Sequence, residues 1–151
     1  MPRPKKKRMV YHPPIYTEFK PVCKSRKSLN EIVLSLDEYE AIRLVDKNGL
    51  DHEEASREME ISRSTLSRLI DKAHKKVADF LIEGKLLLID GGDIHFRGNI
   101  IKCAHCGYMF NINFDKSIKK CPSCQSEDLF DLAGGFGHGK CCKYRNQNEG
   151  R

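Results

Sequence analysis

The fold is decided between residues 51 and 84, where the chain reads DHEEASREME ISRSTLSRLI DKAHKKVADF LIEG. Asp51 and Glu54 have the spacing of a capping box, which predicts a short helix over residues 51–59. Ser62 is a good N-cap for a second helix, and Gly84 is a natural stop for it. Two capped helices joined by a tight turn at residues 59–61 predict a helix-turn-helix.

The longer helix, from Arg63 to about Glu83, has two chemically different faces. Apolar residues recur at helical spacing on the inner face: Leu66, Leu69, Ile70, Ala73, Val77, Phe80 and Leu81. Near its start, the outer face carries Arg63, Ser64, Ser67 and Arg68. Arginine can pair with guanine through two hydrogen bonds, and serine binds phosphates or bases, so these four residues are candidate DNA contacts. The alternative is that the two arginines form an ordinary solvated helix face.

The segments around this pair are less regular. A preceding helix is predicted over residues 35–46, with Ser35 and Glu38 as a second capping box. Residues 1–28 hold five of the six prolines and are expected to be irregular. Residues 85–97 suggest a β-hairpin, with a simple linker strand as the alternative.

Four cysteines form two CxxC pairs, separated by 14 residues: Cys103, Cys106, Cys121 and Cys124. Two such pairs at this separation predict a tetrahedral metal site that stabilises a small β-ribbon over residues 99–132. Four thiolates close the coordination sphere, so the expected ion is one structural Zn²⁺ per chain. Iron can occupy the same ligands, and the choice between the two metals stays open.

The net charge of +6 is unevenly distributed. Residues 1–35 carry a net +7, residues 36–84 a net −4, and residues 85–151 a net +3. The N-terminal excess includes a basic arm, for which the expected role is contact with DNA phosphates or the minor groove: Arg3, Lys5, Lys6, Lys7 and Arg8. The alternative for this arm is a solubilising tail.

Length and composition limit the classes of protein. The 151 residues suffice for one compact domain or two small ones. No apolar run approaches the roughly 20 residues that span a bilayer, and no signal peptide is evident, so we expect a cytoplasmic protein without a membrane partner. We expect no enzymatic activity, because the sequence shows no nucleophile–base pair, phosphate-cradling glycine loop or open metal site.

Four metal-ligating or redox-active side chains remain outside the CxxC pairs: Cys23, His138, Cys141 and Cys142. The adjacent cysteines with a nearby histidine could form a metal or redox sensor. The alternative is that they belong to an unstructured, glycine-rich tail.

Several stretches resemble a known family: Met1-Pro-Arg-Pro, Phe19-Lys-Pro, Leu36-Asp-Glu-Tyr-Glu-Ala-Ile-Arg-Leu-Val-Asp, Glu53-Glu-Ala, Ile61-Ser-Arg-Ser-Thr, Gly84-Lys and Gly91-Gly. Over residues 1–92 the chain looks like domain-of-unknown-function family one-three-four, small predicted DNA-binding proteins of bacteria and archaea. Its helix-turn-helix is similar to that of sigma-factor region 4. The resemblance implies DNA binding and a role in transcription. Glu60 departs from the family's usual glycine, which suits positive φ, and His52 departs from its usual glutamine.

Together these patterns predict an α+β protein in four parts: a basic, proline-rich arm (1–28), a helix-turn-helix domain with a β-hairpin (29–98), a zinc ribbon (99–132) and a flexible tail (133–151). The expected function is sequence-specific binding of double-stranded DNA, as a homodimeric transcription regulator. One alternative is a protein-interaction adaptor of the transcription machinery, with RNA polymerase or another protein docked on the ribbon. The other is a sensor that acts through the C-terminal cysteines.

Overall fold

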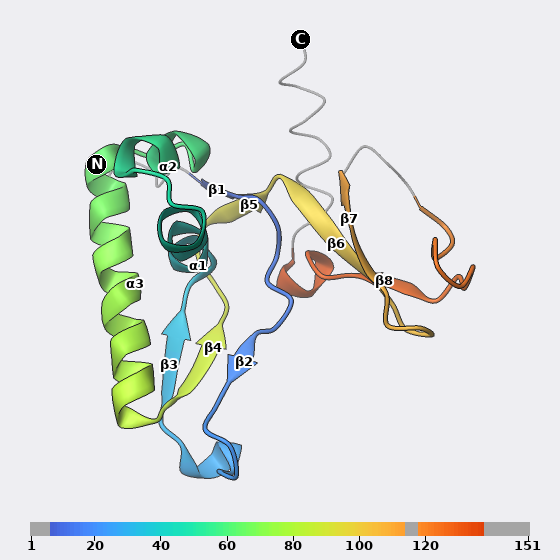
Figure 1. Ribbon diagram of the computed structural model, residues 1–151, viewed down its shortest axis with the longest axis horizontal. Helices are drawn as coiled ribbons and strands as arrows, with labels where there is room; N and C mark the ends of the chain where they lie inside the picture. The colour runs from blue at the N-terminus through green and yellow to red at the C-terminus, as the bar shows by residue number, and fades with distance from the viewer. Residues whose placement is uncertain (1–6, 114–117, 138–151) are drawn as a thin grey trace. The chain divides into compact units, whose positions relative to one another are not determined.

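The computed structural model describes residues 7–113 and 118–137, and it combines helices with small β-sheets (Figure 1). This confirms the predicted α+β class. The chain divides into two compact units, which are described separately here. One unit contains residues 16–94 and the N-terminal stretch through Met9, and the other contains residues 10–15 and the chain from His95 onward.

Three helical segments form the first unit, and all three were predicted. Helix α1 (Leu36–Ile42) continues into a π-helical turn, η2 (Arg43–Lys47), and is followed by α2 (His52–Glu58) and α3 (Arg63–Glu83). Both predicted capping boxes are present, at Ser35 with Glu38 and at Asp51 with Glu54. Gly84 ends α3 in the left-handed conformation, with φ of 66°, as expected of a glycine C-cap.

The helices pack through one apolar cluster. Its buried members come from α1, η2, α2 with its C-cap residue, and α3, and they are Ala41, Leu44, Ala55, Met59, Leu66, Leu69 and Ile70. Ala55 is fully buried where α2 approaches α3, so a larger side chain at this position would push the two helices apart. The first half of α3 is therefore fixed against α2 by its apolar face, as its periodicity predicts.

A three-stranded sheet completes this unit, in the order β2-β4-β3. Strand β3 (Glu31–Leu34) runs parallel to β4 (Leu86–Ile89), and β2 (Glu18–Phe19) pairs antiparallel with β4. Strand β3 was not predicted. The predicted hairpin over residues 85–97 is wrong, because β4 pairs with β2 and β3, whereas β5 (Ile94–Phe96) pairs with β1 (Arg8–Val10).

The N-terminal segment is more regular than its prolines suggested. Strands β1 and β2 and a 3₁₀ turn, η1 (Arg26–Ser28), all lie before residue 29. Pro13 and Pro14 are buried, and in the sequence they lie after β1 and before β2, where no ladder hydrogen bond is needed from them. The expectation of an irregular segment is therefore wrong for β1, β2 and η1, and it holds for the other described residues before residue 29.

Buried acidic groups tie α1 to its surroundings. Glu38, 5% exposed, accepts hydrogen bonds from Lys76 Nζ of α3 at 2.8 and 3.0 Å. The same ammonium donates to the carbonyl oxygen of Val33 in β3 at 2.8 Å. Asp37 pairs with Arg8, and the backbone of Gly92 lies close against it, leaving only 3.0 Å between the Asp37 carboxylate and an added Cβ.

The second unit is built on an antiparallel sheet with the order β7-β6-β8. Its strands are β6 (Gly98–Cys103), β7 (Met109–Asn113) and β8 (Leu129–Asp131), followed by a 3₁₀ turn, η3 (Gly134–Phe136). Ile100 and Ile101 of β6 are buried, and Asn99 Oδ1 accepts the backbone N–H of Ala133 at 3.0 Å. This is the small β-ribbon that the cysteine spacing predicts.

Within the parts of the chain that the structure describes, no helix has the length and apolarity needed to cross a membrane.

Candidate metal centre and nucleic-acid surface

Two turns with the same hydrogen-bond pattern bring the cysteine pairs of the ribbon together. In the first, the Cys103 carbonyl accepts the N–H of Gly107 at 3.0 Å, and Gly107 has φ of 77°. In the second, the Cys121 carbonyl accepts the N–H of Gln125 at 2.9 Å, and Gln125 has φ of 64°. A residue with positive φ after each CxxC was not predicted, although the glycine after Cys106 is a signal that could have indicated it.

The four sulfur atoms converge on one point, and all lie within 4.8 Å of one another. Cys103 Sγ lies 3.6 Å from Cys124 Sγ, and Cys106 Sγ lies 3.6 Å from Cys121 Sγ. Four sulfurs at about 2.3 Å from a tetrahedral Zn²⁺ would lie about 3.8 Å apart. The separations are far from the roughly 2.05 Å of a disulfide. The donor set therefore fits a tetrahedral metal ion, and these four cysteines could hold one.

The thiol groups of this site have displaced pKa values. The pKa of Cys103 is lowered to about 6, because the backbone N–H groups of Cys106 and His105 donate to its sulfur. For Cys124, the backbone N–H of Ser126 lowers the pKa, but burial and the neighbouring cysteine sulfurs outweigh it and raise the value to about 12. Four thiolates cannot share this space without a compensating charge, which a divalent cation would supply.

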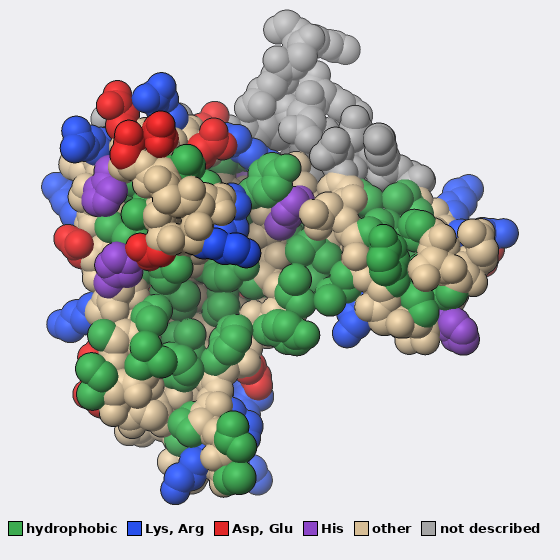
Figure 2. All heavy atoms as spheres, in the orientation of Figure 1, with side chains coloured by type: hydrophobic (Ala, Val, Ile, Leu, Met, Phe, Trp, Pro, Cys, Tyr) green, Lys and Arg blue, Asp and Glu red, His purple; other side chains and the backbone are tan. Residues whose placement is uncertain are grey.

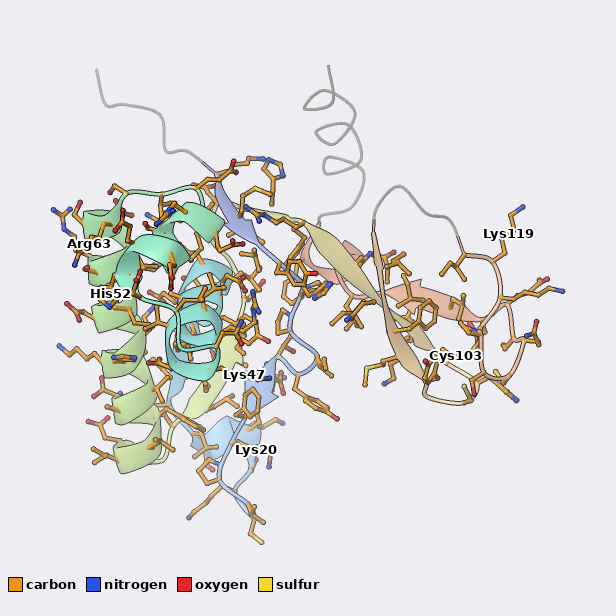
Figure 3. The ribbon with its side chains drawn as sticks, turned by 45° about the horizontal axis from the view of Figure 1, so that its top comes forward. Lys20, Lys47, His52, Arg63, Cys103 and Lys119 are labelled. Atoms are coloured by element: carbon orange, nitrogen blue, oxygen red, sulfur yellow. The ribbon has the colours of Figure 1, made fainter. Side chains whose placement is uncertain are left out.

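The surface of the ribbon is partly apolar. Tyr108 and Phe130 are 46% and 47% exposed, and Tyr108 stacks on Phe110 with 5.8 Å between ring centroids. Lys119 and Lys120, just before the second cysteine pair, are exposed, and Lys119 points away from the ribbon (Figure 3). His105 is exposed and is not among the four metal-binding candidates.

The predicted DNA-contacting side chains lie at the start of α3. Arg63, Ser64 and Arg68 are exposed, and Figure 3 shows Arg63 directed away from the body of its unit. Neither arginine has an ion-pair or hydrogen-bond partner for its side chain among the described residues. Arg63 and Arg68 are therefore available on one surface of α3, here called the α3 face. This surface also carries Ser64, whose Oγ lies 3.2 Å from the Oγ of the N-cap Ser62.

The fourth, Ser67, is half-buried and engaged. Its Oγ lies 2.9 Å from Nδ1 of His52, the first residue of α2. This contact couples the two helices at the edge of the α3 face, and it was not predicted. The two residues are 15 positions apart, so no local pattern indicates that they meet.

The turn between α2 and α3 is tightly hydrogen-bonded. The N–H of Ile61 donates to the Ser56 carbonyl at 3.0 Å, and the N–H of Glu60 donates to the Arg57 carbonyl at 3.1 Å. Glu60 has φ of 55°. The glutamate at this position therefore adopts the positive φ that the sequence analysis associates with glycine.

The predicted arm is only partly within the described residues. Arg3, Lys5 and Lys6 lie outside them, Lys7 is exposed, and Arg8 lies in β1 with its guanidinium paired to Asp37. Of the additional sensor candidates, Cys23 is exposed, while His138, Cys141 and Cys142 lie outside the described residues. Cys23 is not among the four cysteines that could hold a metal ion. The backbone N–H of Met9, next to Arg8, donates to the Met59 carbonyl in the turn between α2 and α3 at 3.1 Å.

Comparison with known proteins gives a consistent picture. The sequence model of the family described as "Protein of unknown function DUF134" matches residues 1–97. A "UPF0251 protein" of Moorella thermoacetica is 40% identical over 150 residues, covering 99% of each chain. A second, from Chloroherpeton thalassium, is 44% identical over 132 residues and 87% of each chain. A third, from Chlorobaculum tepidum, is 39% identical over 145 residues, which are 93% of this chain and 74% of the relative. No solved structure matches.

Proposed function

The chain belongs to the DUF134 family, and we propose that it is a transcription regulator that binds duplex DNA sequence-specifically through α2, the following turn and α3. The α3 face carries this proposal. It presents a serine and two arginines, whose side chains have no partner among the described residues, at the start of a capped helix. The opposite face of this helix is buried against α2. This is the arrangement in which the second helix of a helix-turn-helix contacts base edges from the major groove.

The chemistry of the α3 face suits specific recognition. An arginine that is free of intramolecular partners can place two N–H groups on O6 and N7 of guanine without first breaking an ion pair. Ser64 adds a donor and acceptor beside Arg63. The contact between His52 and Ser67 would fix the serine hydroxyl at the edge of this surface, so that fewer side-chain conformations are lost on binding.

We further propose that the cysteine cluster holds zinc and that the metal is structural. All four candidate ligands are thiolates, so no coordination position remains for a reacting water. When bound, the ion would cross-link the two CxxC turns.

The ribbon supports a second candidate function, as an adaptor that docks another protein of the transcription machinery. The supporting observation is the exposure of Tyr108, Phe130 and Ile118, which are 46%, 47% and 39% exposed. Aromatic side chains of this kind are enriched at protein interfaces. This candidate predicts that binding of DNA is weak and insensitive to sequence.

Alanine substitutions on the α3 face test the leading proposal. Arg63→Ala and Arg68→Ala should each weaken binding of the preferred duplex by about 1–3 kcal/mol, measured by fluorescence anisotropy at fixed salt. A control variant, Lys72→Ala with Lys75→Ala, removes two exposed charges from α3 farther along the helix and should have little effect. Equal losses in both variants would point to general electrostatic attraction and would argue against base recognition.

A further inference from the structure

A compact cluster of positive charge lies far from the α3 face, in the loop between β2 and β3. Residues 20–27 read KPVCKSRK, with four lysine or arginine residues and no acidic ones. All four basic side chains, Lys20, Lys24, Arg26 and Lys27, are exposed. Figure 2 shows the Lys and Arg side chains gathered at this end of the unit.

The 20–27 loop has a defined shape. Cys23 adopts φ of 67°, and Lys20 Nζ donates to the Lys24 carbonyl at 2.6 Å across the turn. Ser25 caps the η1 turn by accepting the N–H of Lys27 at 3.3 Å, and its carbonyl accepts the Ser28 hydroxyl at 2.8 Å. The loop is anchored at its base by the pairing of β2 with β4. Its cations are therefore presented on a folded turn, which lowers the entropy that a ligand must remove on binding.

Little of this charge is neutralised within the protein. Arg26 pairs with Glu18 at 2.8 Å, and both side chains are about half exposed. The side chains of Lys24 and Lys27 have no partner in the part of the chain that the structure describes. Val22, 89% exposed, stands among them and contacts nothing that would bury it. A preorganised turn with free ammonium groups is suited to the closely spaced phosphates of a polyanion.

The position of the loop separates it from the α3 face. Pro21 lies beside Gly84, with 3.7 Å between its Cγ and an added Cβ, so the loop adjoins the C-terminal end of α3 (Figure 1). The α3 face is near the other end of this helix of 21 residues. At 1.5 Å per residue, Arg68 and Arg63 lie about 24 Å and about 31 Å along the helix axis from Gly84. A major groove is only about 12 Å wide. A duplex that receives the start of α3 in its groove therefore leaves the loop free.

From this arrangement we propose that the 20–27 loop is a second DNA-binding site, which holds the phosphate backbone of another duplex segment without reading its sequence. The protein would then connect two segments, one at the α3 face and one at the loop. The choice of DNA as the polyanion rests on the proposed function. A lipid surface is disfavoured because one valine offers a bilayer only about 1.5–3 kcal/mol of apolar burial.

A bridging assay with the full-length, metal-loaded protein tests this. One duplex of the preferred sequence is fixed to beads, and retention of a second, labelled duplex of unrelated sequence is measured. Lys24→Gln with Lys27→Gln should reduce retention of the second duplex at least about tenfold, because two phosphate contacts are lost. Binding to the first duplex should stay within about threefold of wild type, since the α3 face is intact.

The matched control is Lys72→Gln with Lys75→Gln, which removes the same charge from exposed positions on α3. Unchanged bridging in the loop variant, or an equal loss in this control, would overturn the proposal. So would a loop variant that bridges normally but no longer binds vesicles of anionic phospholipid. The double variant Arg63→Ala with Arg68→Ala separates the two proposals. If it binds the first duplex with wild-type affinity, base recognition by α3 is refuted. The proposal for the loop is tested only by retention of the second duplex.

Discussion

At the residue scale, Glu60 occupies a backbone conformation that disfavours its side chain. Its φ of 55° is in the left-handed region, which costs a residue with a Cβ roughly 1–2 kcal/mol relative to glycine. The turn is nevertheless fixed by the hydrogen bonds of Glu60 and Ile61 to α2. The surrounding packing of Met59, which is fully buried, evidently outweighs this local cost.

Replacing Glu60 with glycine should therefore stabilise the helical unit. We expect Glu60→Gly to raise the free energy of unfolding by about 1 kcal/mol, measured by urea denaturation followed by circular dichroism. Glu60→Ala is the control, because it removes the same side chain but keeps the Cβ that creates the strain. If the two variants unfold at the same urea concentration, backbone strain at this position is not significant.

At the element scale, Lys76 joins three elements through one ammonium group. It donates to Glu38 of α1 and to the backbone of β3, and it belongs to α3. Because Glu38 is buried, removal of Lys76 would leave a carboxylate without its positive partner in a poorly solvated place. The pair thus fixes the position of α3 relative to α1. Its net contribution to the free energy of unfolding is small, because forming it also removes two charges from water.

Lys76→Met should lower the free energy of unfolding of the unit by about 2 kcal/mol in the same urea measurement. This loss is smaller than the loss on breaking a fully buried ion pair, because the lysine side chain is 32% exposed. Combining it with Glu38→Gln should restore a large part of that loss, since the unpaired charge is then absent. A double variant that is as unstable as the sum of the single variants would show that the two side chains do not interact.

Local patterns predicted the helices of this protein well but not its strand pairing. The caps at Ser35, Asp51 and Ser62 and the stop at Gly84 depend on residues within four positions of one another, so they can be read directly from the sequence. Strand β4 instead pairs with β3, more than 50 residues earlier. A short apolar run such as Leu86–Ile89 does not specify its partner, and the nearest apolar run was wrongly chosen.

At the scale of the whole molecule, the sequence indicated the cysteine cluster because two CxxC pairs are a strong and local signal. It did not indicate the 20–27 loop as a site, since the same charges on an irregular arm would simply be solvated. The folded turn, and its distance from Arg63 along α3, became visible only in the structure. The two compact units also have different sources of stability, because only one of them contains the four cysteines.

Removal of the metal should therefore unfold the ribbon and spare the helices. We expect about one zinc per chain by elemental analysis, lost in Cys121→Ser and retained in Cys23→Ser. After chelation, hydrogen exchange should accelerate in β6, β7 and β8 and remain slow in α1 and α3, while helical circular dichroism persists. Unchanged exchange in the ribbon after complete metal removal would contradict a structural role for the ion.

The central claim is sequence-specific recognition of DNA by the α3 face, and selection from a random duplex library by the full-length, metal-loaded protein tests it most directly. The account predicts one enriched motif, bound roughly 10³-fold or more tightly than scrambled duplex at the same salt concentration. That preference should disappear when Arg63 and Arg68 are both replaced by alanine. Recovery of no motif, with binding that depends only on salt, would contradict the account and favour the adaptor function of the ribbon.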